Sequence, residues 1–365
     1  MYEIFNINSK NFCYPIKIGN GFITSSNSLA DTEKHILIDE LVANLWPESN
    51  HEKAITIEAI EIFKTLDTVS QLIEKLRLLG VNRRSLVYSI GGGVVQDLST
   101  MTTAIYMRGI DWIYCPTTLL SMVDSCIGGK SSLNVGMFKN LAGNYYPPKE
   151  VWIDIAFCKT LSETEKIAGL CEAVKICYAD NGSAFDDYLR LTSNAKDQYS
   201  DEYLIEIVKL SLKTKKRFIE EDEFDNGVRL LLNFGHTFGH AFEAATQFLI
   251  THGIAVGLGM LAEVRLAILL NEMHSKPVRL SYLESYILNL LVKIKDLNTK
   301  LKKLSLEQAM HAFKSDKKHN RHSYSIVMPN QDGFLSRVNL PITCELDKLI
   351  FNIFVDFKNG INFEI

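Results

Sequence analysis

The chain has 365 residues, of which 47% are hydrophobic and 22% charged, and this is typical of a soluble globular protein with room for two domains. Its net charge of −4 gives no electrostatic reason to expect nucleic acid or an anionic membrane as a partner. The N-terminus lacks the basic start and apolar block of a signal peptide. No apolar run is expected to be long enough to span a bilayer.

The cysteines favour a reducing compartment. They are odd in number, scattered, and form no CxxC pair, so we expect free thiols in a cytoplasmic protein. The seven are Cys13, Cys115, Cys126, Cys158, Cys171, Cys177 and Cys344.

The first 155 residues alternate between strand and helix patterns. A helix is predicted over residues 68–79, where Val69, Leu72 and Leu76 recur at helical spacing. The apolar run that follows ends abruptly in three glycines, Gly91–Gly93. Strand, helix, strand and glycines in this order predict a parallel α/β sheet with a ligand at its strand ends. The predicted strands cover residues 2–7, 14–19, 35–39, 54–60, 85–90 and 112–116.

Long amphipathic segments replace this pattern after about Ile155. Only residues 323–329 still look like a strand. We therefore predict an α/β domain over residues 1–155 and a mostly α-helical domain over residues 156–365. The predicted helical segments are 162–178, 201–220, 232–248, 252–272 and 279–295.

The segment GGGVVQD, residues 91–97, could hold a pyrophosphate. Glycines let backbone N–H groups approach the phosphates, and a helix N-terminus favours their charge. The segment is not GxGxxG, so an ordinary strand-to-helix turn is the alternative. PTTLLSMVDS, residues 116–125, adds two hydroxyls and Asp124 after the next strand, and is a weak motif by itself.

Two lysines stand among glycine, serine and asparagine residues. Lys130 in IGGKSSLN and Lys139 in FKNLAG could bind a phosphate or carboxylate, or could be solvated loop lysines. The first segment contains GKS, but a complete phosphate-binding loop needs a glycine at the position of Asp124. An ordinary ATPase is therefore excluded.

GLCEAVK, residues 169–175, places Glu172 and Lys175 on one helical face. Taken alone, a surface ion pair is the favoured interpretation, and it would contribute little to stability. As part of a site, Glu172 could supply the carboxylate that a metal site with two histidines lacks.

RLLLNFGHTFGHAFEAATQFLITHG, residues 229–253, is the most informative segment of the chain. His236 and His240 share one helical face, while Arg229 and Asn233 precede them with the same spacing. Polar groups in an apolar run indicate a functional groove, and histidine is the commonest metal ligand. Thr237 stands where a zinc protease HExxH motif needs glutamate, so a protease is disfavoured.

Taken in order, these segments resemble the 3-dehydroquinate synthase family. The resemblance rests on SIGGGVVQDLS, YMRG (106–109), PTTLLSMVDSCIGGKSSLN, KNLAG, YYPP, GLCEAVK, RLLLNFGHTFGHAFE and HG, and it runs from about residue 35 to 330. It implies an N-terminal nucleotide-binding α/β domain and a helical C-terminal domain. It also implies NAD and a divalent metal, zinc or cobalt, as cofactors.

The resemblance also assigns site residues. The implied metal ligands are Glu172, His236 and His252. The implied NAD contacts are Asp39, Glu61, Lys64, Gly92, Gly93, Asp97, Thr117, Thr118 and Asp124, with Lys139 and Lys318 near NAD or phosphate. The implied substrate contacts are Lys130, Asn140, Lys175, Lys215, Arg229, Asn233 and His240, with Asp124 touching substrate as well as NAD. Arg108 matches an arginine that reaches the phosphate across a dimer interface, so a homodimer is expected.

The implied reaction converts 3-deoxy-D-arabino-heptulosonate 7-phosphate to 3-dehydroquinate with loss of phosphate, in the shikimate pathway of aromatic amino acid biosynthesis. The cycle is redox-neutral, so NAD is not consumed, and His240 is the candidate for proton transfer. Three positions depart from the family pattern: Gln96 replaces glycine in GGGVxGD, Ile254 replaces glutamate after His252-Gly253, and Leu41 replaces asparagine near Asp39.

Three alternatives remain open. A related cyclase could act on sedoheptulose 7-phosphate or a similar sugar phosphate. The departures at Gln96 and Ile254 are compatible with this interpretation. An NAD- and metal-dependent alcohol dehydrogenase would have little use for so many anion-binding lysines. A catalytically inactive paralogue serving as a binding protein is disfavoured by the intact metal set.

Overall fold

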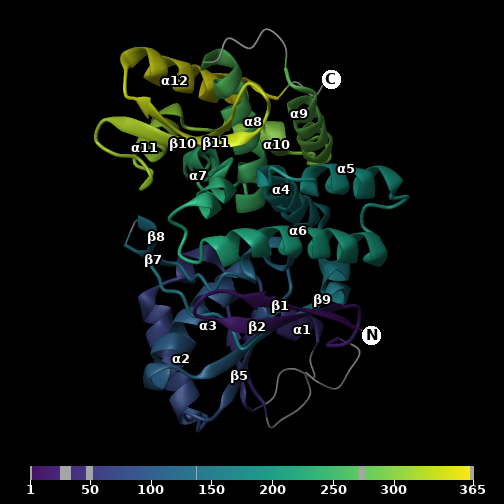
Figure 1. Cartoon of the computed structure of the whole chain (residues 1–365). Coiled ribbons are helices and arrows are strands. Elements are labelled where there is room, and N and C mark those ends of the chain that lie inside the picture. The colour runs from purple at the N-terminus through teal and green to yellow at the C-terminus, as the bar shows by residue number, and fades with distance from the viewer. Residues whose placement is uncertain (1, 25–33, 47–51, 137, 271–275, 362–365) are drawn as a thin grey trace. The chain divides into compact units, whose positions relative to one another are not determined.

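The structure is a computed structural model that describes residues 2–24, 34–46, 52–136, 138–270 and 276–361. The chain divides into two compact units (Figure 1). Unit 1 contains Met1–Lys166 and Leu191–Glu223, and unit 2 contains Ile167–Arg190 and Phe224–Ile365. The functional division expected at residue 155 stays a prediction.

In the part of the chain that the structure describes, unit 1 is built on a seven-stranded sheet with the order β1-β2-β9-β6-β5-β3-β4. All neighbouring strands are parallel except the β1–β2 hairpin. The strands are β1 Tyr2–Asn8, β2 Cys13–Gly19, β3 His35–Asp39, β4 Ala54–Ile57, β5 Leu86–Gly91, β6 Asp111–Pro116 and β9 Glu150–Asp154. The predicted parallel sheet is confirmed, whereas strand β9 was not anticipated and the predicted strand 54–60 ends at Ile57.

The helices and short elements of unit 1 follow the strands. They are α1 Glu40–Leu45, η2 Glu61–Phe63, α2 Leu66–Leu78, α3 Gly93–Ile105, η3 Tyr106–Arg108, η4 Ser121–Ser125, η5 Ile155–Thr160 and α6 Asp201–Glu221, with a small hairpin of β7 Leu133–Val135 and β8 Phe138–Ala142. Helix α4, Glu163–Ala179, begins in unit 1 and continues into unit 2, and α5, Ala184–Asn194, runs back.

Alternation along β5 separates the two faces of the sheet. The Ser89 hydroxyl donates to Ser99 Oγ of α3 at 2.7 Å, so this residue faces α3. Its neighbours Tyr88 and Ile90 point to the other face, where Tyr88 packs edge-on against Trp152. Both faces of β5 are therefore covered, which explains its mostly apolar sequence, and its one polar side chain, Ser89, is satisfied by Ser99.

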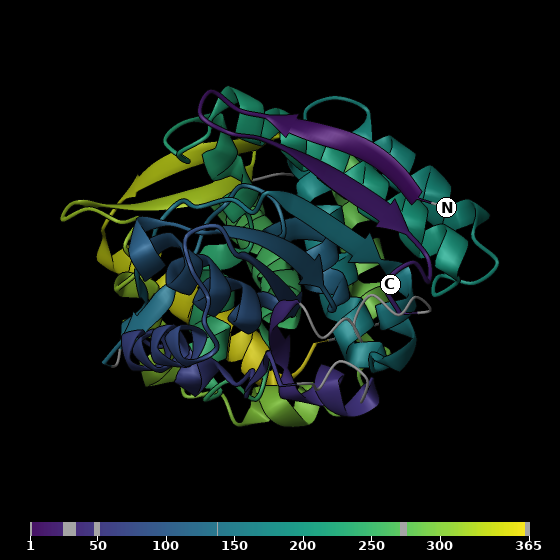
Figure 2. The ribbon, with the colours of Figure 1, turned by 90° about the horizontal axis from the view of Figure 1, so that it is seen from below.

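The β1–β2 hairpin lies along α6 in both views (Figures 1 and 2). Lys209 of α6 donates to Glu3 at 2.6 Å, and the Asn8 amide donates to Glu220 at 2.6 Å. Helix α6 therefore belongs to the packing of unit 1 although it comes late in the sequence.

Unit 2 is mostly helical, as predicted (Figure 1). Its remaining elements are η6 Val228–Asn233, α7 His236–Ala245, α8 His252–Leu270, α9 Val278–Leu291, α10 Leu297–Lys302, α11 Leu306–Lys314, β10 Ser323–Pro329, β11 Leu335–Pro341 and α12 Cys344–Asn359. The expectation of a single strand here is wrong, because β11 pairs antiparallel with β10. After its first residue, β11 alternates half-buried and exposed residues, which leaves it less apolar than β10.

Helix α8 corrects a sequence expectation. An 18-residue window of this 19-residue helix has a mean hydropathy of 1.9, and the helix is long and apolar enough to span a bilayer. Within the described residues, however, 78% of that window is buried inside the protein. Burial within the protein accounts for its apolar sequence, since a helix that is hydrophobic all round can be a core helix.

Candidate functional site

The glycine turn after β5 leaves the backbone accessible at the start of α3. A Cβ on Gly91 would lie 2.5 Å from Val95 Cγ2, so the first glycine is required by packing. A Cβ on Gly92 would lie 3.0 Å from Thr118 Cγ2, whereas one on Gly93 would meet nothing within 4 Å. The backbone at Gly93 is therefore accessible at the N-terminus of a 13-residue helix, which suits a phosphate.

Other predicted residues lie at the carboxyl ends of neighbouring strands. Asp39 ends β3 beside β5, caps α1 by accepting from the Leu41 amide at 2.9 Å, and has a pKa raised by burial. The Thr117 amide donates to Gly91 O at 3.1 Å, and the Thr118 hydroxyl bonds Ser121 at 2.8 Å. Strand ends of this kind are where α/β sheets bind ligands.

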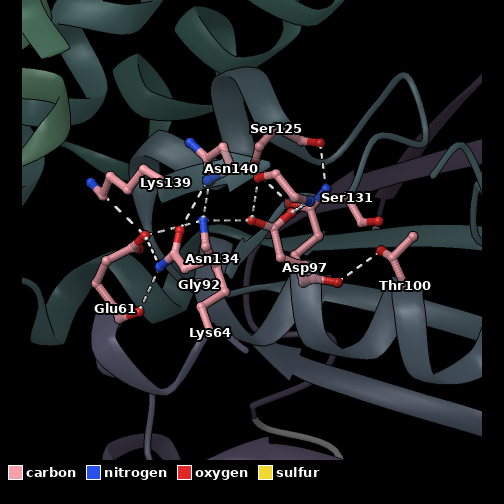
Figure 3. Close-up of polar contacts among 12 residues, drawn as sticks. Glu61, Lys64, Gly92, Asp97, Thr100, Ser125, Ser131, Asn134, Lys139 and Asn140 are labelled. Atoms are coloured by element: carbon pink, nitrogen blue, oxygen red, sulfur yellow. Dashed lines mark hydrogen bonds and ion pairs between the residues drawn. The ribbon is translucent and has the colours of Figure 1, made fainter. Parts of the chain in front are cut away.

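Lys64 is the centre of a buried polar network (Figure 3). Its ammonium donates to Asp97 Oδ2 at 3.0 Å and to Asn140 Oδ1 at 2.9 Å, and lies 3.3 Å from Glu61 Oε1. Only 7% of the Lys64 side chain is exposed. Burial lowers the pKa of Lys64, but the carboxylates of Asp97 and Glu61 outweigh it and raise the pKa overall.

The Asp97 carboxylate is held on several sides. Besides Lys64, it accepts from the amide and the hydroxyl of Ser132, at 3.1 and 3.0 Å. Burial nevertheless raises its pKa, because desolvation disfavours the charged form. In this structure Asp97 orders the Lys64 network.

The β7–β8 hairpin brings the remaining members of the network into reach. Asn140 has a left-handed backbone with φ of 52°, and its amide donates to Asn134 Oδ1 at 3.0 Å. Asn134 in turn donates to Glu61, and Lys139 lies 3.8 Å from Glu61 Oε1 (Figure 3). A non-glycine residue with a left-handed backbone is uncommon, and such residues are found mostly in turns and at functional sites.

Asp124 and Lys215 form a second pair in unit 1. The Lys215 ammonium donates to Asp124 Oδ1 at 2.5 Å and to the Asp124 carbonyl at 2.6 Å. Lys215 comes from the buried side of α6, and Asp124 from the π-helical turn η4. The structure thus joins two predicted residues that are far apart in sequence.

Lys130 and Arg108 lie where the backbone takes left-handed conformations, Lys130 in an isolated bridge with Tyr145 and Arg108 at the end of η3. Lys130 is half-buried and follows two glycines with left-handed backbones, Gly128 and Gly129. Arg108 is exposed and itself has a φ of 66°, next to Met107 at 49°. For the non-glycine residues Met107 and Arg108 this conformation costs free energy, and such strain clusters at functional sites.

In unit 2, Glu172, His236 and His252 converge. His252 Nε2 lies 3.5 Å from Glu172 Oε1, and His236 Nε2 lies 3.9 Å from the same oxygen. Two ligands bound to one tetrahedral ion at about 2.1 Å lie about 3.4 Å apart. Two imidazoles and one carboxylate therefore fit a catalytic zinc-type ion with a fourth position left for another ligand.

Each imidazole is oriented through its other nitrogen. His236 Nδ1 lies 3.3 Å from the Phe234 carbonyl, and His252 Nδ1 lies 3.1 Å from Glu243 Oε2. These contacts direct both Nε2 atoms toward Glu172, as histidine ligands of metals usually are. His240, Glu243 and His252 form a second close group. Because Glu243 already binds His252 Nδ1, we interpret Glu243 as orienting that ring.

Glycines and a buried glutamate fix the helix that carries His236. A Cβ on Gly259 of α8 would lie 1.9 Å from Gly235 O, so α7 and α8 meet closely there. Gly235 has no side chain to cap α7, and Glu263 of α8 accepts its amide hydrogen at 2.6 Å instead. Burial raises the pKa of Glu263 to about 8.

Lys175 contacts the Glu172 carboxylate, and both side chains are buried. The surface ion pair favoured from this motif alone is therefore wrong. Burial lowers the pKa of His236 well below its usual value, and the Lys175 ammonium lowers it further. His236 is consequently neutral at neutral pH, which is the form that binds a metal.

His240 faces a charged pair on the segment after α11. Its Nδ1 lies 4.0 Å from Asp316 Oδ2, and Lys318 donates to that oxygen at 2.6 Å. Burial and the Lys318 charge lower the pKa of His240 to about 4. His240 is therefore neutral at neutral pH.

Arg229 and Asn233 lie on η6 just before α7. Arg229 is buried, with 2% of its surface exposed, and Asn233 donates to the Leu230 carbonyl at 3.0 Å. The predicted continuous helix 232–248 is wrong at its start, because left-handed Gly235 separates η6 from α7. The break sets these two residues on a separate element from the histidines.

Sequence analysis did not identify several residues of the Lys64 network and of the histidine site in unit 2. Glu243 lies three residues after His240, so its helical spacing could have revealed it. Ser132, Asp316 and Glu263 gave no such signal, because loop geometry or helix packing brings each into place.

Comparison with known proteins places most of the chain in one family. Residues 54–168 match 3-dehydroquinate synthase N-terminal, and residues 169–319 match 3-dehydroquinate synthase C-terminal. The 3-dehydroquinate synthase of Prochlorococcus marinus (strain AS9601) is 35% identical over 301 residues, covering 81% of this chain and 80% of the relative.

Solved structures share the fold over nearly the whole chain. A 2-deoxy-scyllo-inosose synthase complexed with carbaglucose-6-phosphate, NAD+ and Co2+ has a TM-score of 0.77 at 24% identity, covering 98% of this chain and 100% of the other. The 2-epi-5-epi-valiolone synthase of Streptomyces hygroscopicus, with NAD+ and Zn2+ bound, has a TM-score of 0.79 at 22% identity, covering 96% and 99%. At these identities the likeness concerns the fold.

Proposed function

Because the chain belongs to the 3-dehydroquinate synthase family, we propose that it is a cyclase dependent on NAD and a divalent metal. Its substrate would be 3-deoxy-D-arabino-heptulosonate 7-phosphate, and its products 3-dehydroquinate and phosphate. The observation that carries this proposal is the convergence of one carboxylate oxygen and two Nε2 atoms at Glu172, His236 and His252.

Zinc or cobalt would be held by these three residues. The bound ion would supply Lewis acidity, which lowers the pKa of substrate hydroxyl groups. The residues of this chain prepare the site by keeping His236 neutral and by orienting both rings through Phe234 and Glu243.

NAD would bind at the strand ends of unit 1. The open backbone at Gly93 suits the pyrophosphate, and Asp39 suits a ribose hydroxyl at the end of the neighbouring strand. Fold relatives solved with NAD+ and with Co2+ or Zn2+ support both cofactors.

The substrate has a phosphate, a carboxylate and several hydroxyls, and different residues suit each. Lys130, Asn140 and Arg108 would orient the phosphate, with Arg108 supplied by a second subunit of a homodimer. Lys175, Lys215 and Arg229 would bind the carboxylate and hydroxyls. Neutral His240 would accept a proton, since its lowered pKa leaves the imidazole unprotonated at neutral pH.

The test is phosphate release from 3-deoxy-D-arabino-heptulosonate 7-phosphate with catalytic NAD and added zinc or cobalt. Sedoheptulose 7-phosphate, which lacks the carboxylate, is assayed in parallel. Release from the first substrate alone, without net NADH, supports the proposal. Release from the second alone overturns the substrate assignment and directs attention to Gln96 and to Ile254, which is buried in the first turn of α8.

Replacing Glu243 with glutamine is expected to weaken zinc binding about 10- to 100-fold, because a carboxylate that orients a ligand histidine contributes by this much. Titration calorimetry with Zn2+ measures the change. Glu284→Gln, on α9 away from the three ligands, serves as a control. If Glu243→Gln binds zinc like the wild type, Glu243 does not set the orientation of His252.

Arg229→Lys is expected to raise KM for the carboxylate-bearing substrate about 10- to 100-fold, since a charged hydrogen bond contributes about 1.5–3 kcal/mol. The comparison is made by steady-state kinetics at saturating NAD and metal. Unchanged kinetics would show that Arg229 does not contact the carboxylate.

A further inference from the structure

The π-helical turn η4 leaves consecutive backbone carbonyls to be satisfied from outside. In a helix of this kind the N–H groups bond five residues back, as Cys126 N does to Ser121 O at 3.1 Å. The carbonyls at the end of the turn then need other donors, because unpaired buried carbonyls are costly. Such turns are rare in proteins overall, and those that occur are often found at functional sites.

Three side chains bind three consecutive carbonyls of this turn. Ser211 Oγ donates to Val123 O at 2.9 Å, and Lys215 Nζ donates to Asp124 O at 2.6 Å. Both donors come from α6, one helical turn apart, and approach from that helix. The third carbonyl, Ser125 O, accepts from Gln96 Nε2 of α3 at 2.6 Å.

Gln96 makes two hydrogen bonds to Ser125 of η4. While its Nε2 donates to the Ser125 carbonyl, its Oε1 accepts from the Ser125 hydroxyl at 2.6 Å. The side chain is buried, with 4% of its surface exposed, so neither bond is easily replaced by water. A primary amide suits this place, because it offers a donor and an acceptor side by side without a charge.

We propose that Gln96 is a positioning residue that fixes η4 so that Asp124 is presented in one geometry, with its carboxylate against Lys215. The proposal rests on the proposed function for its effect on turnover, since Asp124 is there assigned to NAD and substrate. Its structural part, the fixing of η4, is independent of the substrate. Gln96 also lies at the start of α3, so it connects the glycine turn to the turn that carries Asp124.

The experiment compares Gln96→Met with Ser99→Ala in the full-length protein. Methionine keeps the length of the side chain and removes both hydrogen bonds. Ser99→Ala removes a buried hydrogen bond, Ser89 to Ser99, from the same helix without touching η4. Amide hydrogen exchange of peptides covering residues 121–126 is expected to rise more than about 10-fold in Gln96→Met and to stay unchanged in Ser99→Ala.

Turnover gives the second readout through a double-mutant cycle. In the wild-type background, Gln96→Met is expected to lower kcat/KM more than about 10-fold. In the Asp124→Asn background the expected loss is less than about 3-fold, because the carboxylate that Gln96 positions is already altered. Equal losses in the two backgrounds, or equal exchange rates in Gln96→Met and Ser99→Ala, would overturn the proposal. If the wild type turns over neither sugar phosphate, the proposed function fails, while the exchange experiment still decides the role of Gln96.

Discussion

His236→Ala is expected to abolish zinc binding and turnover together. The substitution removes one of three converging donors and leaves Glu172 and His252, which cannot hold a catalytic ion tightly. Loss of a residue that only orients a metal ligand weakens metal binding about 10- to 100-fold, so loss of the ligand itself should weaken metal binding by more. Metal content after dialysis against zinc, measured by atomic emission, gives the occupancy directly.

Two histidine controls sharpen this prediction. His322→Ala removes an exposed histidine after α11 and should leave the metal in place. His240→Ala should keep the metal and lose turnover, because His240 lies outside the group of Glu172, His236 and His252 and is the proposed proton acceptor. Full zinc occupancy in His236→Ala, with loss in His240→Ala, would move the ion to the group of His240, Glu243 and His252.

The fold was predictable wherever one periodicity dominated. The apolar run 85–90 before three glycines predicted β5, and the run 35–39 predicted β3 up to Asp39. Strand β11 was missed because it alternates as a half-exposed strand does, without a continuous apolar run. The membership of α6 in unit 1 depends on packing against η4, η5 and the β1–β2 hairpin, which local sequence does not encode.

In the candidate metal site, too, spacing within one helix was predictable from sequence, whereas contacts between distant segments were not. The histidine spacing on α7 follows from sequence, and the rings of His236 and His240 lie 5.5 Å apart on that helix. The ligand set that joins His236 to Glu172 and His252 came from the resemblance, because α4 lies more than 50 residues earlier in the chain. The burial of Glu172 with Lys175 was not predictable, since an i,i+3 ion pair is usually a surface feature. The partners of Gln96 were likewise hidden, because they belong to a π-helical turn that sequence reasoning does not anticipate.

Lys64→Met is expected to destabilise the protein by about 3–5 kcal/mol, because it leaves the Asp97 carboxylate buried without its ammonium partner. It should also weaken NAD binding, since Lys64 holds Asn140 and Glu61 in the same network. Urea unfolding measures the first effect and NAD titration the second. The double variant Lys64→Met/Asp97→Asn separates them: it removes the uncompensated charge and should recover most of the stability, while NAD binding stays weak. A loss below about 1 kcal/mol in the single variant would show that Asp97 does not depend on Lys64.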